Sequence, residues 1–273
     1  MALVNKIIPF SCVDGPGNRM VIFFQGCNFK CLYCHNPETI NKCISCGKCV
    51  ENCEVGALSI NDGKVIWNEE ECISCDKCIK ICDYMSSPKT KDYSVEELVK
   101  KIEKDSFFIR GITVSGGECT LNSEFLVRLF KEVKKLGLTC FVDTNGNTKL
   151  DDELINLTDK FMVDVKSISE SENIWLTGSS NKLVLENLKK LLDLDKVYEV
   201  RSVIAKGLHN ENTVEEVSKI ITNKCRYKLI KYRPFGVREE GLLTFGENFL
   251  GEDYMENLKN IARDKGCLDV LIT

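Results

Sequence analysis

The sequence predicts an α/β protein built as a partial (β/α)6 barrel of the TIM type, with a small cysteine-rich domain inserted in it. Short apolar runs alternate with amphipathic helical patterns along most of the chain, and eleven of the sixteen cysteines fall between Cys27 and Cys82. Residues 40–88 interrupt the alternation. We therefore expect three parts: the start of the barrel with a cysteine loop (1–39), the insertion (40–88) and the remainder of the barrel (89–273).

The expected strands are short and rich in β-branched residues. The first begins near Arg19 as RMVIFFQG, and the others read GITVSG, LTCFVDTN, FMVDVKS, VYEVRSVIA, YKLIKYRPF and CLDVLIT. Because helical patterns separate them, we expect parallel strands joined by right-handed crossovers, with the chemistry at their carboxyl ends.

Helix boundaries can be predicted between these strands. Ser94 with Glu97, and Asn212 with Glu215, have the spacing of capping boxes. Gly137 is placed to end the helix that follows residue 122.

The composition predicts a folded, soluble protein that is not exported. With 273 residues, 43% of them hydrophobic, the chain can bury a sizeable core. The 37 basic and 41 acidic residues give a formal charge of -4, which offers no case for a nucleic acid or membrane partner. No apolar run is long enough to span a bilayer, so we expect a cytoplasmic protein. We also expect it to be a monomer. In a reducing cytoplasm so many cysteines indicate metal binding or catalysis.

The first cysteine motif is GCNFKCLYCHNPE, which places Cys27, Cys31 and Cys34 in a loop directly after a strand. Three thiolates can hold a 4Fe-4S cluster and leave its fourth iron open to the amino and carboxylate groups of a methionine moiety. A zinc site with three sulfur ligands is the alternative.

This C-x-x-x-C-x-x-C motif after a strand resembles the signature of the radical S-adenosylmethionine (SAM) enzymes. Preceded by CVDGPGNRMVIFFQG and followed by HNPET, it is similar to the activating enzymes of glycyl radical enzymes, most of all the YjjW-type activases. The similarity runs over nearly the whole chain. It implies an oxidoreductase that cleaves SAM reductively to a 5'-deoxyadenosyl radical, which removes hydrogen from a backbone glycine of a partner enzyme.

Two further motifs, CISCGKCVENC and CISCDKCIKIC, form an internal repeat offset by 29 residues. Three cysteines at successive intervals of three suit a cubane better than zinc, which remains the alternative. In two-cluster ferredoxins the fourth cysteine ligates the other cluster. We therefore expect a ferredoxin-type domain in which one cluster is held by Cys43, Cys46, Cys49 and Cys82, and the other by Cys72, Cys75, Cys78 and Cys53.

Acidic residues replace the proline that usually follows the fourth cysteine of each motif. They are Glu54 and Asp83. Negative charge near a cluster disfavours its reduced form, so we expect these residues to lower the reduction potential.

The strand GITVSG ends in Ser115, Gly116, Gly117 and Glu118. Two glycines let a backbone approach a ligand that side chains would exclude, although a tight turn is the simpler interpretation. The run resembles the G-G-E-P motif of the family, which implies that Gly116 and Gly117 lie against the methionyl end of SAM. Cys119 replaces the proline and adds a thiol near the pocket.

The next two strand ends, FVDTNG and FMVDVK, carry Asp143, Asp164 and Lys166. Buried carboxylates seldom stand alone. By resemblance to the pyruvate formate-lyase activase, Asp143 and Asp164 are expected to bind a monovalent cation, and Lys166 to pair with the carboxylate of SAM. A structural ion pair between Asp164 and Lys166 is the alternative.

The resemblance implies a complete cofactor site and one substrate contact. Arg201 matches an arginine of the family's pocket, and the alternative is a solvated residue at the end of a strand. His35 is expected to contact SAM, and the alternative is that it only packs against neighbouring residues. Asp14, within VDGPG, matches a position near the incoming glycyl loop. The expected cofactor residues are Tyr33, Cys34, His35, Ser115, Gly116, Gly117, Glu118, Asp143, Asp164, Val165, Lys166 and Arg201.

The resulting hypothesis has three 4Fe-4S clusters, SAM and a flavodoxin or ferredoxin-type reductant. The alternatives are a radical SAM enzyme that acts on a small molecule and an iron-sulfur electron-transfer protein. VDGPG and the insertion weigh against the first, and the three-cysteine loop weighs against the second. Four scattered cysteines are expected to be small apolar core residues: Cys12, Cys140, Cys225 and Cys267.

Overall fold

A single curved sheet organises the molecule in the computed structural model, which describes residues 1–247 and 250–273. Within these residues the sheet has nine strands in the order β11-β10-β9-β8-β7-β6-β2-β1-β5. Their bounds are β1 Ala2–Ser11, β2 Arg19–Phe24, β5 Lys91–Tyr93, β6 Gly111–Gly116, β7 Thr139–Thr144, β8 Lys160–Asp164, β9 Val197–Ile204, β10 Arg226–Lys231 and β11 Val270–Ile272. In the sheet order, every neighbouring pair from β11 through β6 to β2 is parallel. This confirms an α/β fold with a mostly parallel sheet.

A strand does begin at Arg19, as predicted, but it is the second strand of the chain, because β1 precedes it. β1 pairs antiparallel with β2, with Ile7 opposite Ile22, and β5 adds a further antiparallel strand at the edge. Lys6 and Pro9 interrupt the apolar pattern of β1. An edge region tolerates both residues, because part of its surface stays in contact with solvent.

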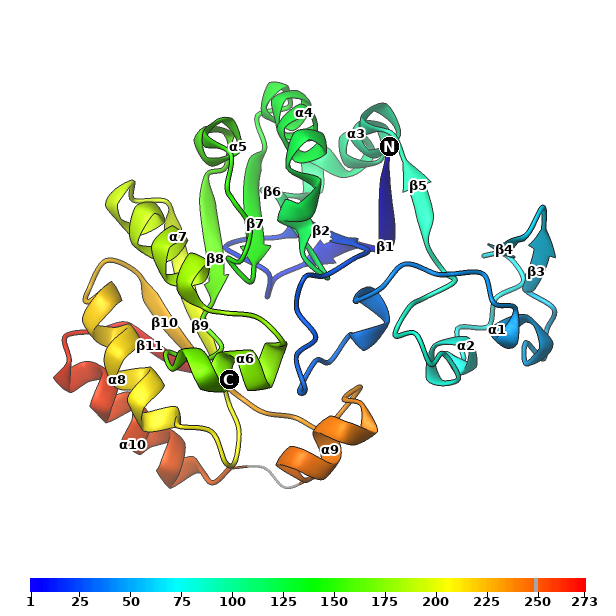
Figure 1. The fold of residues 1–273 in the computed structure, drawn as a ribbon. Helices are drawn as coiled ribbons and strands as arrows, with labels where there is room; N and C mark the ends of the chain where they lie inside the picture. Colours follow the sequence, from blue (N-terminus) through cyan, green and yellow to red (C-terminus); the bar gives the residue numbers. More distant parts are fainter. Residues whose placement is uncertain (248–249) are drawn as a thin grey trace.

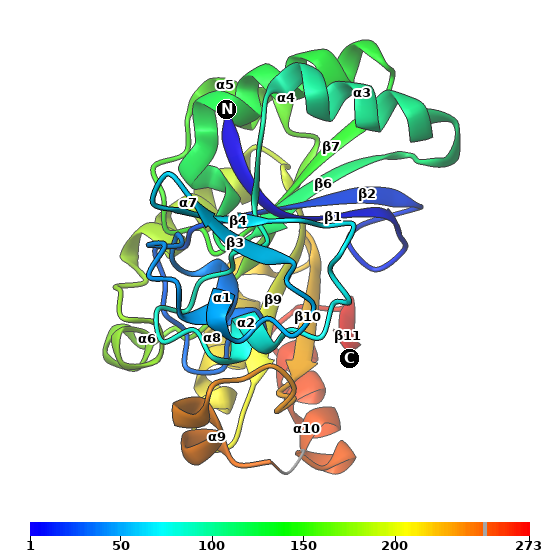
Figure 2. The same cartoon turned by 90° about the vertical axis from the view of Figure 1, so that its right-hand side faces the viewer.

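Helices cover the outside of the sheet (Figure 1). Their bounds are α3 Val95–Asp105, α4 Ser123–Lys135, α5 Asp152–Leu157, α6 Glu170–Thr177, α7 Lys182–Asp193, α8 Asn210–Ile221, α9 Glu239–Phe245 and α10 Glu252–Asp264, with 3-10 turns η1 Pro37–Thr39, η2 Ser106–Phe108 and η3 Cys119–Asn122. Figure 2 shows α9 and α10 at the opposite end of the molecule from α3 and α4. Each parallel strand therefore returns through a helix that packs its apolar side on the sheet.

Two of the predicted helix boundaries are confirmed and one is wrong. Ser94 and Glu97 form the capping box of α3, and Gly137 takes a positive φ of 72° just after α4. The box at Asn212 is absent, because α8 already begins at Asn210. The Asn210 side chain donates to the carbonyl of Ala205 at 2.9 Å, which fixes the chain just before α8. The helix therefore begins before the position that the capping pattern indicated.

The cysteine-rich insertion forms a small body beside the sheet (Figure 1). It contains α1 Lys48–Glu51, the hairpin β3 Leu58–Asn61 and β4 Lys64–Trp67, and α2 Lys77–Lys80. Its own apolar cluster centres on three buried residues, Cys49, Leu58 and Cys78. The chain leaves the barrel at Asn41 and returns at Ser86, and these two residues pair in a parallel bridge.

No helix in residues 1–247 and 250–273 combines the length and apolar character that crossing a bilayer requires.

Replacing Ser94 with Ala should lower the free energy of unfolding by about 1 kcal/mol, because the first turn of α3 loses its capping bond. Ser94 Oγ accepts from the Glu97 N–H at 3.2 Å, and Glu97 Oε2 accepts from the Ser94 N–H at 2.7 Å. Urea denaturation measures the change. Ser106→Ala at the other end of the same helix is the control and should have little effect; equal losses in both variants would contradict the capping role.

Candidate functional site

The three-cysteine loop follows β2 at the carboxyl end of the parallel strands. Its backbone is fixed by α6, since the N–H groups of Lys30 and Leu32 donate to the carbonyls of Thr177 and Leu176 at 2.8 and 2.9 Å. On another side α9 approaches so closely that a Cβ at Gly241 would lie 2.0 Å from the Leu32 carbonyl. The loop is therefore held in one conformation by two helices.

The loop gathers three thiols in an apolar environment. Cys31 is buried, and Cys27 and Cys34 are partly buried. Burial, together with the charges of the neighbouring thiols, raises the pKa of Cys27 and of Cys31 to about 12. The Phe29 N–H donates to Cys27 Sγ at 3.4 Å, a contact that also suits a thiolate. The chemistry of this donor set fits an iron-sulfur cluster.

Among the residues that the structure describes, no three His, Cys, Asp or Glu side chains are arranged around a single metal ion.

Lys166 joins the loop from the end of β8. Its Nζ lies 2.6 Å from Asp164 Oδ2 and 5.8 Å from the centre of the Tyr33 ring. Its charge opposes the burial that raises the pKa values of Cys31 and Cys34. The ion pair considered as an alternative in the sequence is thus formed, at a position next to the cysteines. Among the described residues, the buried Tyr33 hydroxyl has no hydrogen-bond partner, which leaves a polar atom available beside the loop.

A second charged group lies on the neighbouring strands. Arg201, only 9% exposed, donates to Asp143 Oδ1 at 3.0 Å and to Glu199 Oε1 at 2.6 Å. Ser115 donates to the other oxygen of Asp143 at 3.0 Å. Burial raises the pKa of Asp143, with Arg201 opposing and Asp164 adding to the rise. Arg201 is therefore not a solvated strand-end residue.

Gly116 and Gly117 face the protein's own backbone. A Cβ at Gly116 would lie 2.3 Å from the backbone N and O of Phe24, and one at Gly117 would lie 2.3 Å from the carbonyl of Gly26. Close packing of the end of β6 on the chain after β2 is thus sufficient to require glycine at both positions. The expected contact with the methionyl group stays a prediction.

Glu118 is buried and engages the ends of two strands. Its Oε1 accepts from the Thr120 N–H at 3.0 Å, the Thr120 hydroxyl at 2.5 Å and the Thr144 hydroxyl at 2.8 Å, and its Oε2 accepts from the Asn145 N–H at 2.7 Å. The Asn145 side chain in turn lies 3.8 Å from Cys27 Sγ. Glu118 thus positions the chain beside the cysteine loop, and sequence reasoning had not anticipated the role of Asn145.

Three other expected residues have definite positions. His35 Nε2 bonds the carbonyl of Arg233 at 2.9 Å, which ties the loop to the segment after β10. Val165 is buried and its N–H donates to the Arg201 carbonyl at 2.9 Å. Cys119 is buried, with its Sγ 3.3 Å from the carbonyl of Asp143.

Asp14 lies in the hairpin between β1 and β2. Its side chain accepts from the Ser11 hydroxyl at 2.5 Å, and its carbonyl accepts from the Thr113 hydroxyl at 2.6 Å. Its negative charge also adds to the rise in the pKa of Asp143. Cys12 in the same hairpin is exposed, so the prediction of a core position is wrong for it, because the hairpin lies at the surface. Cys140 and Cys267 are buried as predicted, and Cys225 is partly buried.

Sequence reasoning missed Arg19, which anchors this hairpin from inside the sheet. It is 1% exposed and donates to the Thr113 hydroxyl at 2.8 Å, the Ile112 carbonyl at 2.6 Å and the Thr139 hydroxyl at 2.9 Å. Its guanidinium lies 4.1 Å from the centre of the Phe141 ring, and burial lowers its pKa to about 10. A charged residue opening a buried strand was the available signal.

The insertion brings the cysteines of its two repeats together. Cysteines of both repeats line one small cavity: Cys43, Cys46 and Cys49 of the first, and Cys78 and Cys82 of the second. Lys48 lies close to both Cys46 and Cys82. The crossed grouping of Cys82 with the cysteines of the first repeat stays a prediction, because Cys78, expected at the other cluster, lines the same cavity.

The acidic residues after each motif pair across the repeat. Glu54 pairs with Lys77, and Asp83 pairs with Lys48 at 2.8 Å. Each carboxylate therefore has a cation beside it, which reduces the negative field that it exerts on a cluster.

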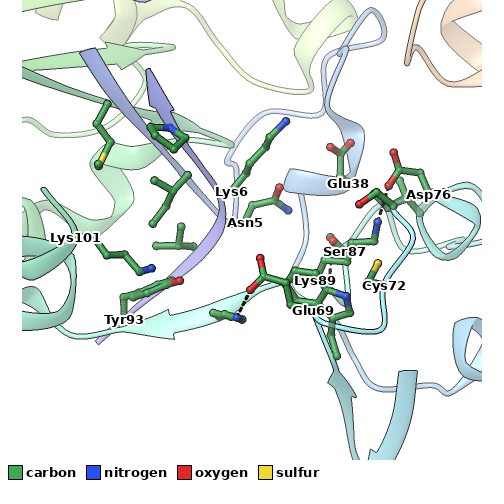
Figure 3. Close-up of a pocket in the computed structure, with 18 of the residues that line it drawn as sticks. Asn5, Lys6, Glu38, Glu69, Cys72, Asp76, Ser87, Lys89, Tyr93 and Lys101 are labelled. Atoms are coloured by element: carbon green, nitrogen blue, oxygen red, sulfur yellow. Dashed lines mark hydrogen bonds and ion pairs between the residues drawn. The ribbon is translucent and has the colours of Figure 1, made fainter. Parts of the chain in front are cut away.

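A cleft of about 630 Å³ separates the insertion from β1 and α3 (Figure 3). Cys72 lies on one wall, near Lys89, whose Nζ pairs with Asp76 at 2.6 Å. Lys91 of β5 pairs with Glu69 at 2.5 Å. Ion pairs thus connect the second cysteine loop to the chain that returns to the barrel.

Comparisons with known proteins agree with this geometry. The family model described as the radical SAM superfamily matches residues 21–222. A glycyl-radical enzyme activating enzyme of Haemophilus influenzae is 32% identical, with 88% of this chain and 86% of that protein covered. The trans-4-hydroxy-L-proline dehydratase activating enzyme of Clostridioides difficile is 35% identical, with 80% of this chain and 78% of that protein covered.

A solved structure supports the fold as well. QueE from Escherichia coli superposes with a TM-score of 0.54 at 15% identity, with 100% of this chain and 93% of that chain covered. The family match spans most of the chain, and both relatives exceed 30% identity over most of their length. This chain therefore belongs to the radical SAM superfamily and, within it, to the glycyl-radical enzyme activating enzymes.

Proposed function

We propose that this activase uses the loop of Cys27, Cys31 and Cys34 to cleave SAM and to generate a radical on a backbone glycine of a partner enzyme. The observation that supports it is the convergence of three thiols with Lys166 and Tyr33 at the carboxyl ends of the strands. Three sulfur ligands leave one iron of a cubane open to the methionyl amino and carboxylate groups.

A cluster and SAM bound here would supply the electron and the homolytic cleavage of a carbon-sulfur bond. The chain contributes position and charge. Lys166, which pairs with Asp164 in the structure, would pair with the carboxylate of SAM, and the unpartnered hydroxyl of Tyr33 lies nearby. Ser115, Val165 and His35 would complete the walls of the pocket, and Asp14 would meet the glycyl loop.

The charges around Asp143 favour one bound monovalent cation. Asp143, Asp164 and Glu199 supply three negative charges, whereas Arg201 and Lys166 supply two positive charges, which leaves one negative charge in the group. A buried uncompensated charge is costly, and a monovalent cation at Asp143 and Asp164 would neutralise it.

The insertion, residues 40–88, would be a ferredoxin-type domain with two clusters. Cys43, Cys46, Cys49 and Cys82 would hold one of them, which is supported by a cavity that these four line together with Cys78. Cys72, Cys75, Cys78 and Cys53 would hold the other. An external flavodoxin or ferredoxin-type reductant would supply the electron, and we propose that the activase works as a monomer.

The activity is tested by electron paramagnetic resonance under nitrogen, with a glycyl radical enzyme encoded beside the gene, this protein, a reductant and SAM. A doublet from a glycine-centred spin, formed together with 5'-deoxyadenosine, is expected. Deoxyadenosine without any spin on the partner would instead indicate a small-molecule substrate.

Anaerobic reconstitution should load about twelve irons per chain, since three cubanes hold four each. Cys31→Ala should lower this to about eight and abolish SAM cleavage, while the signals of the inserted clusters persist. Cys225→Ala, which alters a cysteine outside the three groups, is the control and should keep about twelve irons. A plateau at about four irons in the unmodified protein would contradict the two inserted clusters.

Arg201→Met should move the acid limb of the pH profile of SAM cleavage to higher pH by about 1 to 3 pH units. The carboxyl of Asp143 already has a raised pKa, and Arg201 is the cation that opposes this rise. Without it Asp143 takes up a proton at higher pH, so the anion needed for the cation site is lost earlier as the pH falls. Arg201→Lys should restore part of the shift. Arg226→Met removes a surface ion pair with Asp269 and should leave the profile unchanged; an unmoved limb in Arg201→Met would refute the role of Asp143.

A further inference from the structure

The two cysteine motifs of the insertion end in the same backbone turn. The Gly56 N–H donates to the Cys53 carbonyl at 3.1 Å, and the Met85 N–H donates to the Cys82 carbonyl at 3.4 Å. Gly56 and Met85 both have positive φ, 68° and 49°. The residues that follow these turns therefore occupy equivalent positions in the two repeats.

Those equivalent residues differ in one polar group. They are Ala57 and Ser86, each only 2% exposed. Ser86 Oγ lies 3.3 Å from Cys82 Sγ, whereas Ala57 has no hydroxyl to offer Cys53. A cysteine that ligates iron is a thiolate and has no proton to give, so in the loaded protein the hydroxyl is the donor.

The position of Ser86 is fixed by the chain at the start of the insertion. Asn41 pairs with Ser86, its N–H donates to the Met85 carbonyl at 3.0 Å, and its side chain donates to the Tyr84 carbonyl at 2.8 Å. Ser86 also lines the cavity that Cys43, Cys46, Cys49 and Cys82 line together with Cys78. Two neighbouring segments therefore fix the position of the Ser86 hydroxyl beside the proposed cluster. One is the cysteine motif that ends at Cys82, and the other is the segment at Asn41 that leads to Cys43.

We propose that the Ser86 hydroxyl donates to the Cys82 ligand and raises the reduction potential of the cluster held by Cys43, Cys46, Cys49 and Cys82. The bond withdraws electron density from the sulfur and stabilises the additional negative charge of the reduced cluster. The twin cluster lacks this bond because Ala57 stands at the matching position. The inference rests on the two inserted clusters of the proposed function.

Other groups act on the twin cluster. Lys89 lies near Cys72 and Cys78, and Trp67 lies near Cys72. Because positive charge and donors there also favour a reduced cluster, the order of the two potentials depends on more than Ser86. The effect of Ser86 is therefore measured by comparing the midpoint potential of the same cluster in the unmodified protein and in each variant.

The test is a potentiometric titration followed by electron paramagnetic resonance on the full-length, anaerobically reconstituted protein, with SAM added to identify the cluster that binds it. Ser86→Ala should shift the midpoint of one inserted cluster to a more negative potential and leave the other in place. Ala57→Ser, the reciprocal change, should shift the other cluster to a more positive potential. Each variant should keep about twelve irons.

The outcomes separate the inference from the proposed function. Unchanged midpoints in Ser86→Ala, with twelve irons and SAM cleavage retained, would overturn the role of Ser86 alone. Only about four irons in the unmodified protein would overturn the inserted clusters and this inference together, while cofactor cleavage could still proceed. Normal midpoint shifts without SAM cleavage would overturn the proposed activity and support the role of Ser86.

Discussion

The buried carboxylate of Glu118 is the contact on which the arrangement of the site depends. It accepts four hydrogen bonds from residues at the ends of β6 and β7, so neither strand end can move without leaving a buried donor unpaired. Asn145 extends this connection to the cysteine loop. The cluster loop, the glycine turn and the acidic strand ends therefore form one connected unit on the rigid part of the sheet.

Charge pairing governs the rest of the pocket. Lys166 faces Asp164, and Arg201 bridges Asp143 and Glu199, so each buried cation has a carboxylate partner. Such pairs hold their side chains in place because separating them would leave an unpaired charge in an apolar region. A cofactor that brings its own ammonium and carboxylate groups would exchange partners with these pairs rather than meet bare charges.

Much of the fold and the cysteine chemistry could be predicted because both leave local patterns. Buried parallel strands such as β6 and β7 are continuous apolar runs, and ligand cysteines follow fixed spacings. Contacts between distant segments leave no such pattern. Arg19 meets Thr139 across 120 positions, and Asn145 meets Cys27 across 118 positions, so only the folded chain shows them. β1 was missed for a different reason, because Lys6 and Pro9 disguise a strand near the edge of the sheet.

The bridge between Asn41 and Ser86 has a consequence for the history of the molecule. Because the chain departs and returns at neighbouring points, the whole segment can be gained or lost in one genetic event without displacing the strands around it. The strands of the sheet would thus keep their neighbours whether or not the segment is present.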